Sequence, residues 1–356
     1  MCIRDRDYSV KVAESALARL HVIVRPRPGV EVEFDRTSLE QKIVEAVKSW
    51  TDDLRAILVQ KLGEENGLKC AARFGPAFPE AYKEDVSPWV AAFDVENAAA
   101  VDQGADMRMS LYRPRKPRGG IIRFKLFRKG APIPLSNVLP MLENLGLHIV
   151  SERPYELHLE DEERLWIQDF DMIPAVKREL DLEVIRDRFQ EAFERSLSGE
   201  TDSDGFNRLI IAAQMNWRQV KVLRAYCKYL LQTGIPFSSS YMSETLSRHP
   251  LIARLLIELF EAMFDPERGQ ESEHRREQGR VRLERCFKAL LEGRLAADDV
   301  FVEQLDEVAA ARERDRDTQV DAIRKVFQRA LASVSSLDED RILYAFYQAL
   351  GATLRT

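Results

Sequence analysis

The chain has 356 residues, of which 45% are hydrophobic and 31% are charged, which is enough apolar material for two or three cores. Its 53 Lys and Arg side chains against 59 Asp and Glu give a net charge of −6, which excludes a global positive field that would attract nucleic acid or an anionic membrane. The apolar runs are far shorter than the roughly 18 residues of a membrane span, and the N-terminus lacks the apolar core of a signal peptide. We therefore expect a cytoplasmic protein that binds neither membranes nor nucleic acid.

The first hundred residues mix strand and helix patterns. The apolar run at 20–24 and the alternation at 30–34 predict two strands joined by a turn. Residues 37–40 (TSLE) form a capping box, which predicts that Thr37 caps a long helix whose apolar stripe runs through 39–57. The stretch 71–104 contains three prolines and an apolar, helix-like run at 89–101, and it predicts a connection with one or two short helices.

The next seventy residues predict a small α+β domain with a helix-covered sheet. Alternating apolar and polar residues indicate four strands, which begin near Met109, Ile122, Leu147 and Leu165. Between the second and third strands, apolar residues at helical spacing predict a helix over 135–145.

After Pro174 the pattern is helical. Amphipathic stripes predict helices over 182–193, 217–230 and 252–263. The charged stretches 267–285 and 303–325 keep narrow apolar seams, which are typical of long, solvent-facing helices with coiled-coil character. Helical spacing continues to Thr356, so we interpret the chain as a fragment of a longer polypeptide.

No motif predicts catalysis or cofactor binding. There is no GxGxxG and no phosphate-binding loop, the histidines are scattered, and the four cysteines are too far apart for a zinc site or a disulfide framework. Residues 200–205 (ETDSDG) imitate a calcium loop, but Ile211 stands where a bidentate carboxylate is needed, which favours a helix-capping loop. We therefore assign no catalytic, cofactor-binding or metal-ligating residue.

Two further features of the sequence are compatible with either a binding function or a purely structural role. Residues 113–129 carry eight positive charges and no acid, a candidate anion or nucleic-acid site. We favour neutralisation by the acidic stretch 152–171 on adjacent strands. Trp217, Tyr226 and Tyr229 are candidates for a stacking platform, but core packing on an amphipathic helix is the favoured interpretation.

The run at 121–157, IIRFKLFRKGAPIPLSNVLPMLENLGLHIVSERPYEL, resembles the opening β-loop-α-β of an ACT domain. Together with RLHVIVRPRPG, WTDDLRAILVQKLGEENG and FNRLIIAAQMNWRQVKVLRAYCKYLLQTGIPFSSSYMSETLSRHP, the chain resembles the region of ACT-like modules and helical motifs in the large bacterial NAD-specific glutamate dehydrogenases. The resemblance implies an α+β fold of ACT-like (ferredoxin-like) modules followed by an all-α region. The expected divisions are a foreign start at 1–7, an incomplete ACT-like module with linker helices at 8–104, an ACT-like domain at 105–175 and a helical domain at 176–356.

The resemblance also implies a function for the parent protein, the oxidative deamination of L-glutamate to 2-oxoglutarate with NAD as hydride acceptor. The catalytic domain that would hold NAD is absent from this chain, so we expect no cofactor here. The expected role is regulation and oligomerisation, with three partners: the catalytic domain of its own polypeptide, further copies of itself, and an amino-acid effector. The alternative is a free-standing helical interaction scaffold that binds a partner through its charged helices at 267–325 and has no enzymatic link.

The resemblance places a candidate effector loop before the first helix of the ACT-like run. ACT loops that bind amino acids commonly read Asp-Arg-Pro-Gly, whereas this chain has Arg128, Lys129 and Gly130 there, so the glycine survives and the acid does not. Ser136 and Asn137 lie at the start of the following helix, where free N–H groups and the helix dipole would hold a carboxylate.

Overall fold

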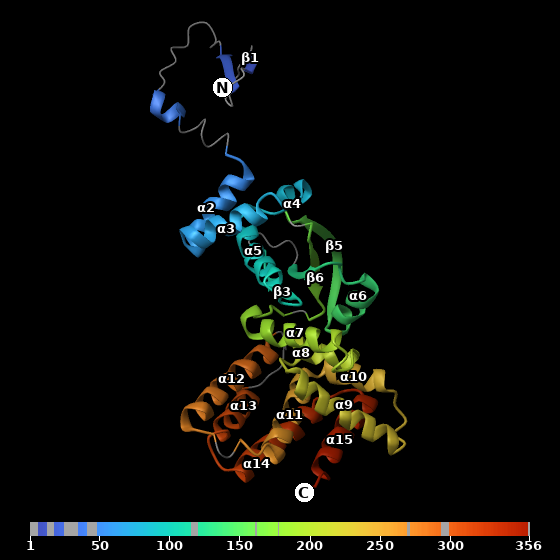
Figure 1. Cartoon of the computed structure of the whole chain (residues 1–356). Coiled ribbons are helices and arrows are strands. Elements are labelled where there is room, and N and C mark those ends of the chain that lie inside the picture. The colour runs from blue at the N-terminus through green and yellow to red at the C-terminus, as the bar shows by residue number, and fades with distance from the viewer. Residues whose placement is uncertain are drawn as a thin grey trace.

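A computed structural model describes residues 6–12, 18–24, 35–40, 48–114, 120–160, 162–176, 178–268, 271–292 and 299–354. Strands β1 (Arg6–Val12) and β2 (Ala18–Val24) pair as an antiparallel hairpin. The predicted strand at 20–24 is therefore confirmed, whereas the one at 30–34 lies outside the described residues. The chain then passes through a helix-flanked sheet into a bundle of helices that ends at the C-terminus (Figure 1).

The long helix predicted from residue 39 is wrong. Residues 36–40 are helical, but the carboxylate of Asp35, not the Thr37 hydroxyl, accepts from the first free N–H groups of this segment. The backbone is non-helical at 48–49, and a new helix, α2 (Trp50–Leu62), begins there. Ser49 and Asp52 form a reciprocal capping box, which starts this helix independently of the earlier segment.

The helices predicted in 71–104 are confirmed, but the stretch is mostly helix and its last helix packs on the sheet, so the prediction that it is only a connection is wrong. Its helices, with the one that precedes them, are α3 (Glu64–Phe74), α4 (Glu80–Asp85) and α5 (Pro88–Asp102). Pro79 and Pro88 occupy the N-cap of α4 and the first turn of α5, where the missing N–H costs nothing. The prolines therefore mark helix starts.

The four predicted strands and the helix between them are confirmed. The strands are β3 (Arg108–Tyr112), β4 (Ile122–Lys129), β5 (Leu147–His158) and β6 (Arg164–Pro174), and the helix is α6 (Leu135–Asn144). They form an antiparallel sheet in the order β3-β4-β6-β5.

The second helix of this module is α7 (Leu182–Leu197), which the sequence pattern did not assign to it. From β4 onward the chain runs β-α-β-β-α, as in a ferredoxin-like module, but no strand follows α7 directly. The edge beside β4, which the final strand of such a module would occupy, is taken by β3, which precedes β4 in the chain. The fold is α+β in this half and all-α beyond it, as expected.

Helices cover both faces of the sheet. On one face Phe124 and Phe170 pack with α6 and with Phe189 and Phe193 of α7. On the other face α5 lies against the sheet, and its buried positions are largely small: Ala91, Ala92, Val95 and Ala98. These small side chains allow the helix to approach the strands closely.

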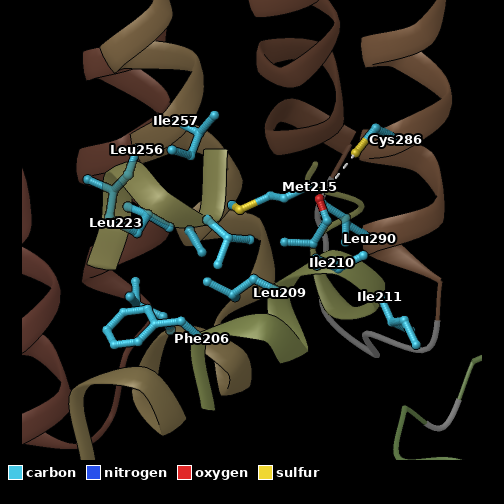
Figure 2. Packing of buried hydrophobic residues seen from close by; sticks show 14 of the residues in the cluster. Phe206, Leu209, Ile210, Ile211, Met215, Leu223, Leu256, Ile257, Cys286 and Leu290 are labelled. Atoms are coloured by element: carbon cyan, nitrogen blue, oxygen red, sulfur yellow. Dashed lines mark hydrogen bonds between the residues drawn. The ribbon is translucent and has the colours of Figure 1, made fainter. Parts of the chain in front are cut away.

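The helical region is built around a buried central helix. Its elements are α8 (Arg208–Ala212), α9 (Trp217–Gln232), α10 (Ser239–Arg248), α11 (Pro250–Phe264), α12 (Glu273–Leu291), α13 (Asp299–Ala311), α14 (Arg316–Ala332) and α15 (Leu337–Gly351). Helix α11 contacts α8, α9, α10, α12, α14 and α15. Figure 2 shows this core, where Leu256 and Ile257 of α11 lie among side chains of α8, α9 and α12.

The charged stretches fold back onto this core. Helix α14 packs against α11 and α13, and the seam residues Phe287 and Phe327 are fully buried. These helices are therefore part of the bundle, and the prediction of solvent-facing coiled-coil helices is wrong in that respect. Within the described residues, no helix combines the length and the apolar character that a membrane span requires.

Candidate effector loop and buried ion cluster

The five residues of the candidate effector loop lie along the connection from β4 to α6. Arg128 and Lys129 end β4 and are exposed, and Gly130 has φ +87°. The Gly130 N–H donates to the Arg164 carbonyl at 2.8 Å, which fixes the start of the loop beside β6. Because this φ strains any side chain, the glycine that the ACT resemblance retains has a conformational reason.

Ser136 and Asn137 occupy the first turn of α6 and are exposed. The N-cap residue is Pro134, and no side chain caps the helix. The Asn137 N–H donates to the Pro134 carbonyl at 2.9 Å. The N–H groups of Leu135 and Ser136 are therefore the ones available to an acceptor. The Lys129 ammonium is turned elsewhere: it pairs with Glu163 and lies 4.0 Å from Asp102. Across the part of the chain that the structure describes, no bond joins Arg128 or Lys129 to this helix start.

Gln168 holds the loop in place, and the sequence analysis missed it. Its amide oxygen accepts from the Ile133 N–H at 2.8 Å and its amide nitrogen donates to the Ile133 carbonyl at 3.0 Å. Gln168 is buried on β6, opposite Leu126 and in phase with Phe170. A glutamine at a core-facing position of an apolar strand was the available signal, since buried amides need specific partners.

A second polar cluster lies on the opposite face of the sheet, under α5. The Lys125 ammonium bonds to the Asp94 carboxylate of α5 and lies 3.7 Å from the Asp169 carboxylate of β6. All three side chains are buried, with exposed fractions of 0–2%. We call Lys125, Asp94 and Asp169 the sheet clamp, because they join helix and sheet through buried charge.

The clamp shifts the ionisation of its members. Burial disfavours the Lys125 ammonium, but the carboxylates of Asp94 and Asp169 outweigh burial and raise its pKa. Burial raises the pKa of Asp169 in spite of the nearby cations. Among the described groups neither Asp169 oxygen has a hydrogen-bond partner, whereas Asp94 also accepts from the Tyr82 hydroxyl.

Cross-strand pairs extend the clamp outward. The guanidinium groups of Arg123 and Arg153 bond to Asp171 at 2.7 and 2.8 Å, and together they lower the pKa of Asp171 against the effect of its burial. Lys129 pairs with Glu163 in the same way. Neutralisation of the basic run by the acidic stretch 152–171 is therefore confirmed for Arg123, Lys125 and Lys129. Arg113 pairs instead with Glu179, and 115–119 lie outside the described residues.

The remaining predicted features are structural. Asp204 caps the next helical turn by accepting from the Phe206 N–H, so the capping role is confirmed. Trp217 is buried and Tyr226 is partly buried, but Tyr229 is 53% exposed, so its assignment to the core is wrong. The described residues hold no group of three or more His, Cys, Asp or Glu side chains suited to a metal ion. The buried charges of the sheet clamp join secondary-structure elements to one another.

Four family models match the chain in succession. They describe the ACT2 domain (residues 2–51), helical motif 2 (57–101), the ACT3 domain (106–185) and helical motif 3 (201–266) of glutamate dehydrogenase. The chain belongs to the NAD-specific glutamate dehydrogenase family. The ACT3 match covers the sheet, and the helical motif 2 match covers most of α2 through α5, so the sheet clamp joins two modules of this family.

Curated relatives from three bacteria are each described as NAD-specific glutamate dehydrogenase. The chain is 44% identical to the Halomonas elongata protein over 260 residues, which are 73% of this chain and 16% of the relative. Identity is 31% to the Pseudomonas aeruginosa protein, over 99% of this chain and 19% of the relative. For the Mycobacterium tuberculosis protein it is 30%, over 98% of this chain and 20% of the relative. The chain thus spans about a fifth of the length of these relatives.

Proposed function

We propose that this chain is the regulatory and oligomerisation portion of an NAD-specific glutamate dehydrogenase. The parent enzyme would convert L-glutamate, NAD and water to 2-oxoglutarate, ammonia and NADH in the cytoplasm, with NAD held by a catalytic domain outside this chain. The observation that carries the proposal is the succession of ACT and helical-motif matches along the sequence. The partners are the catalytic domain and further copies of the chain.

The proposal includes an amino-acid effector at the β4–α6 connection. The uncapped first turn of α6 supplies N–H donors to the carboxylate of the effector. Lys129 supplies a cation when its ammonium leaves Glu163 and pairs with the ligand instead. This exchange couples the loop to β6, because Glu163 and Arg164 hold Lys129 and Gly130 from that side. Arg128, Gly130, Ser136 and Asn137 complete the loop.

Two measurements on the purified chain test this role. Light scattering after size exclusion reports self-association, and calorimetric titration with L-glutamate, L-aspartate and L-arginine reports an effector, with NAD as the control ligand. We expect a dimer or larger assembly and saturable heat with one amino acid, lost in Lys129→Gln and retained in the matched surface variant Arg341→Gln. A monomer that gives no heat with any of the amino acids would overturn the proposal.

The fold does not support the alternative of a free-standing scaffold, which was motivated by the apolar seams of the charged helices. It required the seams of the charged helices to be open to a partner, but Phe287 and Phe327 are buried against the bundle. The sequence matches to glutamate dehydrogenase modules also favour the enzyme-linked role.

A further inference from the structure

A cavity of about 740 Å³ lies between α5, the edge strand β3 and α7, away from the candidate effector loop. Its volume falls within the range of about 300–1,000 Å³ that small-molecule sites occupy. Helix α5 contributes Trp89, Val90 and Phe93 to one wall, and β3 contributes Met109 through Tyr112 to the other. Neither the sequence analysis nor the family matches assign a role to this cavity.

The walls of the cavity are apolar and aromatic. Trp89 and Phe93 stand one helical turn apart on α5, with ring centroids 6.0 Å apart in an edge-to-face arrangement. They are 43% and 44% exposed, whereas the other face of α5 is buried against the sheet. On β3, Leu111 pairs in register with Phe124, so its buried side chain faces α7. Ser110 and Tyr112 face α5 instead. An apolar ligand body between these walls would cover the two aromatic rings.

Two side chains of α7 seal the edge of β3 at this cavity. The Arg186 Nε donates to the Leu111 carbonyl at 3.0 Å, and the Gln190 amide donates to the Met109 carbonyl at 3.1 Å. Both residues also line the cavity. Because the outward carbonyls of the edge strand are already bonded, this surface is poorly suited to pairing with another strand. A compact ligand is the better occupant.

The charges around the cavity favour an anion. Its acids already have partners: Asp85 accepts from the Tyr155 hydroxyl at 2.7 Å, and Asp94 is held by Lys125 in the sheet clamp. Within the described residues, no carboxylate lies within 4.0 Å of the Arg186 guanidinium, and its one hydrogen bond there is the one from Nε to the Leu111 carbonyl. The Tyr112 hydroxyl is buried there without a hydrogen-bond partner.

We propose that this cavity binds a small amphipathic carboxylate, with its aromatic or aliphatic body against Trp89 and Phe93 and its carboxylate on Arg186. The apolar walls exclude a simple inorganic anion as the preferred ligand. The three arginines that line the cavity, Arg113, Arg123 and Arg186, outnumber its two acids and disfavour the ammonium group of a free amino acid. The inference does not rest on the proposed function, because a ligand here requires neither an effector loop nor a catalytic domain.

Calorimetric titration of the full chain with four matched probes tests the ligand chemistry. The probes are 3-phenylpropionate, the neutral 3-phenylpropanol, propionate without the ring, and L-phenylalanine with an added ammonium. We expect 3-phenylpropionate to bind saturably and at least about tenfold more tightly than each of the others, since the charged contact and the apolar body each contribute about one order of magnitude. Absence of saturable 3-phenylpropionate binding overturns the proposal, as does equal binding of the neutral alcohol.

Variants of exposed residues test the location. Arg186→Gln keeps a donor for the Leu111 carbonyl but removes the charge, so it should weaken 3-phenylpropionate binding at least about tenfold. It should leave 3-phenylpropanol unchanged, and Arg186→Lys should restore part of the loss. Phe93→Ala should weaken both ligands.

Three control variants complete the test: Arg341→Gln and Tyr229→Ala match the charge and the exposed aromatic ring elsewhere, and Lys129→Gln removes the candidate effector lysine. All three should bind as the wild type does, with folding checked by urea unfolding for every variant. Binding that is unaffected by both Arg186→Gln and Phe93→Ala would overturn the assigned location. Loss of binding in Lys129→Gln would move the ligand to the effector loop.

Discussion

Two buried charge clusters hold this molecule together, and they differ in how well their carboxylates are satisfied. In the sheet clamp both Asp169 oxygens lack a hydrogen bond among the described groups, and burial raises the Asp169 pKa. In the helical region Glu258 of α11 accepts from Arg254 at 2.6 Å and from Arg268 at 2.7 Å, with Arg312 at 3.8 Å. We call Glu258 and these three arginines the bundle clamp.

The two clamps therefore have different roles. The bundle clamp stabilises a charged carboxylate, whereas the sheet clamp places polar groups beside a cavity. Three cations overcome the burial of Glu258 and lower its pKa to about 2, so the bundle clamp favours the charged state and ties α11 to the chain beyond it. The sheet clamp lies beside the 740 Å³ cavity, which Asp94 also lines. Asp94 therefore both holds α5 on the sheet and lines the cavity.

The largest expected effect is the loss of the Lys125 ammonium. Lys125→Met leaves Asp94 and Asp169 buried without their shared cation, and we expect the free energy of unfolding to fall by about 3–5 kcal/mol. Urea unfolding of the purified chain measures this. The matched control is Lys69→Met, which removes an exposed pair with Glu65 and should cost less than about 1 kcal/mol. Equal losses in the two variants would contradict the clamp.

Removal of the bundle clamp's charge should have a smaller effect. Glu258→Gln keeps one oxygen acceptor for the arginines but removes the carboxylate that pairs with Arg254. Among the described groups, Arg268 then keeps only Glu261 as an ion-pair partner, at 3.7 Å. Arg312 likewise keeps only Glu271, at 3.4 Å. We expect a loss of about 2–4 kcal/mol in the same urea assay at neutral pH. Stability unchanged within about 0.5 kcal/mol would show that the arginines are solvated in another way.

The pH dependence of the stability loss in Glu258→Gln tests the difference between the bundle clamp and the sheet clamp. Between pH 4.5, the ordinary pKa, and about 2, unfolded Glu258 binds a proton and folded Glu258 does not, so acid favours unfolding. The stability difference between wild type and Glu258→Gln should therefore be constant above about pH 5 and shrink as the pH falls toward 2. The stability difference between wild type and Asp169→Asn should change in the opposite direction. Burial raises the pKa of Asp169, so the stability of the wild type falls as the pH rises through that raised pKa. If the stability differences of both variants changed with pH in the same direction, the two clamps would not differ in the way proposed.

Gln168→Leu tests the hydrogen bonds that hold the effector loop. It removes both bonds to Ile133 while keeping an apolar side chain in the core, and we expect a loss of about 1–3 kcal/mol because the Ile133 groups remain buried. Faster amide exchange should be confined to the β4–α6 connection. Faster exchange throughout the sheet would show that Gln168 supports the core as a whole.

The smallest expected effect is at Lys129. Its pair with Glu163 is 38% exposed on each side, so Lys129→Gln should change the free energy of unfolding by less than about 1 kcal/mol. Urea unfolding checks this. A loss comparable to that of Lys125→Met would show that the loop, like the clamp, is a structural element.

Sequence periodicity predicted much of the fold because it reports which residues face a core. The alternation around Phe124 gave β4, and the charges of Arg123 and Asp171 predicted their pairing across strands. The same alternation placed Lys125 on the outer face of the strand without showing that α5 covers that face. Burial by a second layer is a tertiary property, so the sheet clamp was not predictable from the strand pattern.

Two other misses have similar causes. Ser49 restarts a helix inside what looked like one continuous apolar stripe, because a capping box interrupts the backbone while hydrophobic spacing continues across it. The helix at α5 was predicted, but its packing on the sheet was not, since its small residues bury closely without forming a strong apolar stripe. The cavity beside α5 depends on three elements that are distant in sequence, so no local motif indicated it.

The most direct test of the proposed role is an assay of the purified chain for NADH formation with saturating L-glutamate and NAD. A known glutamate dehydrogenase serves as the positive control, and heat-denatured chain serves as the blank. If the chain is the regulatory and oligomerisation portion of its parent, NADH absorbance will not rise above the blank. A sustained, glutamate-dependent rise in proportion to the amount of chain would contradict the account.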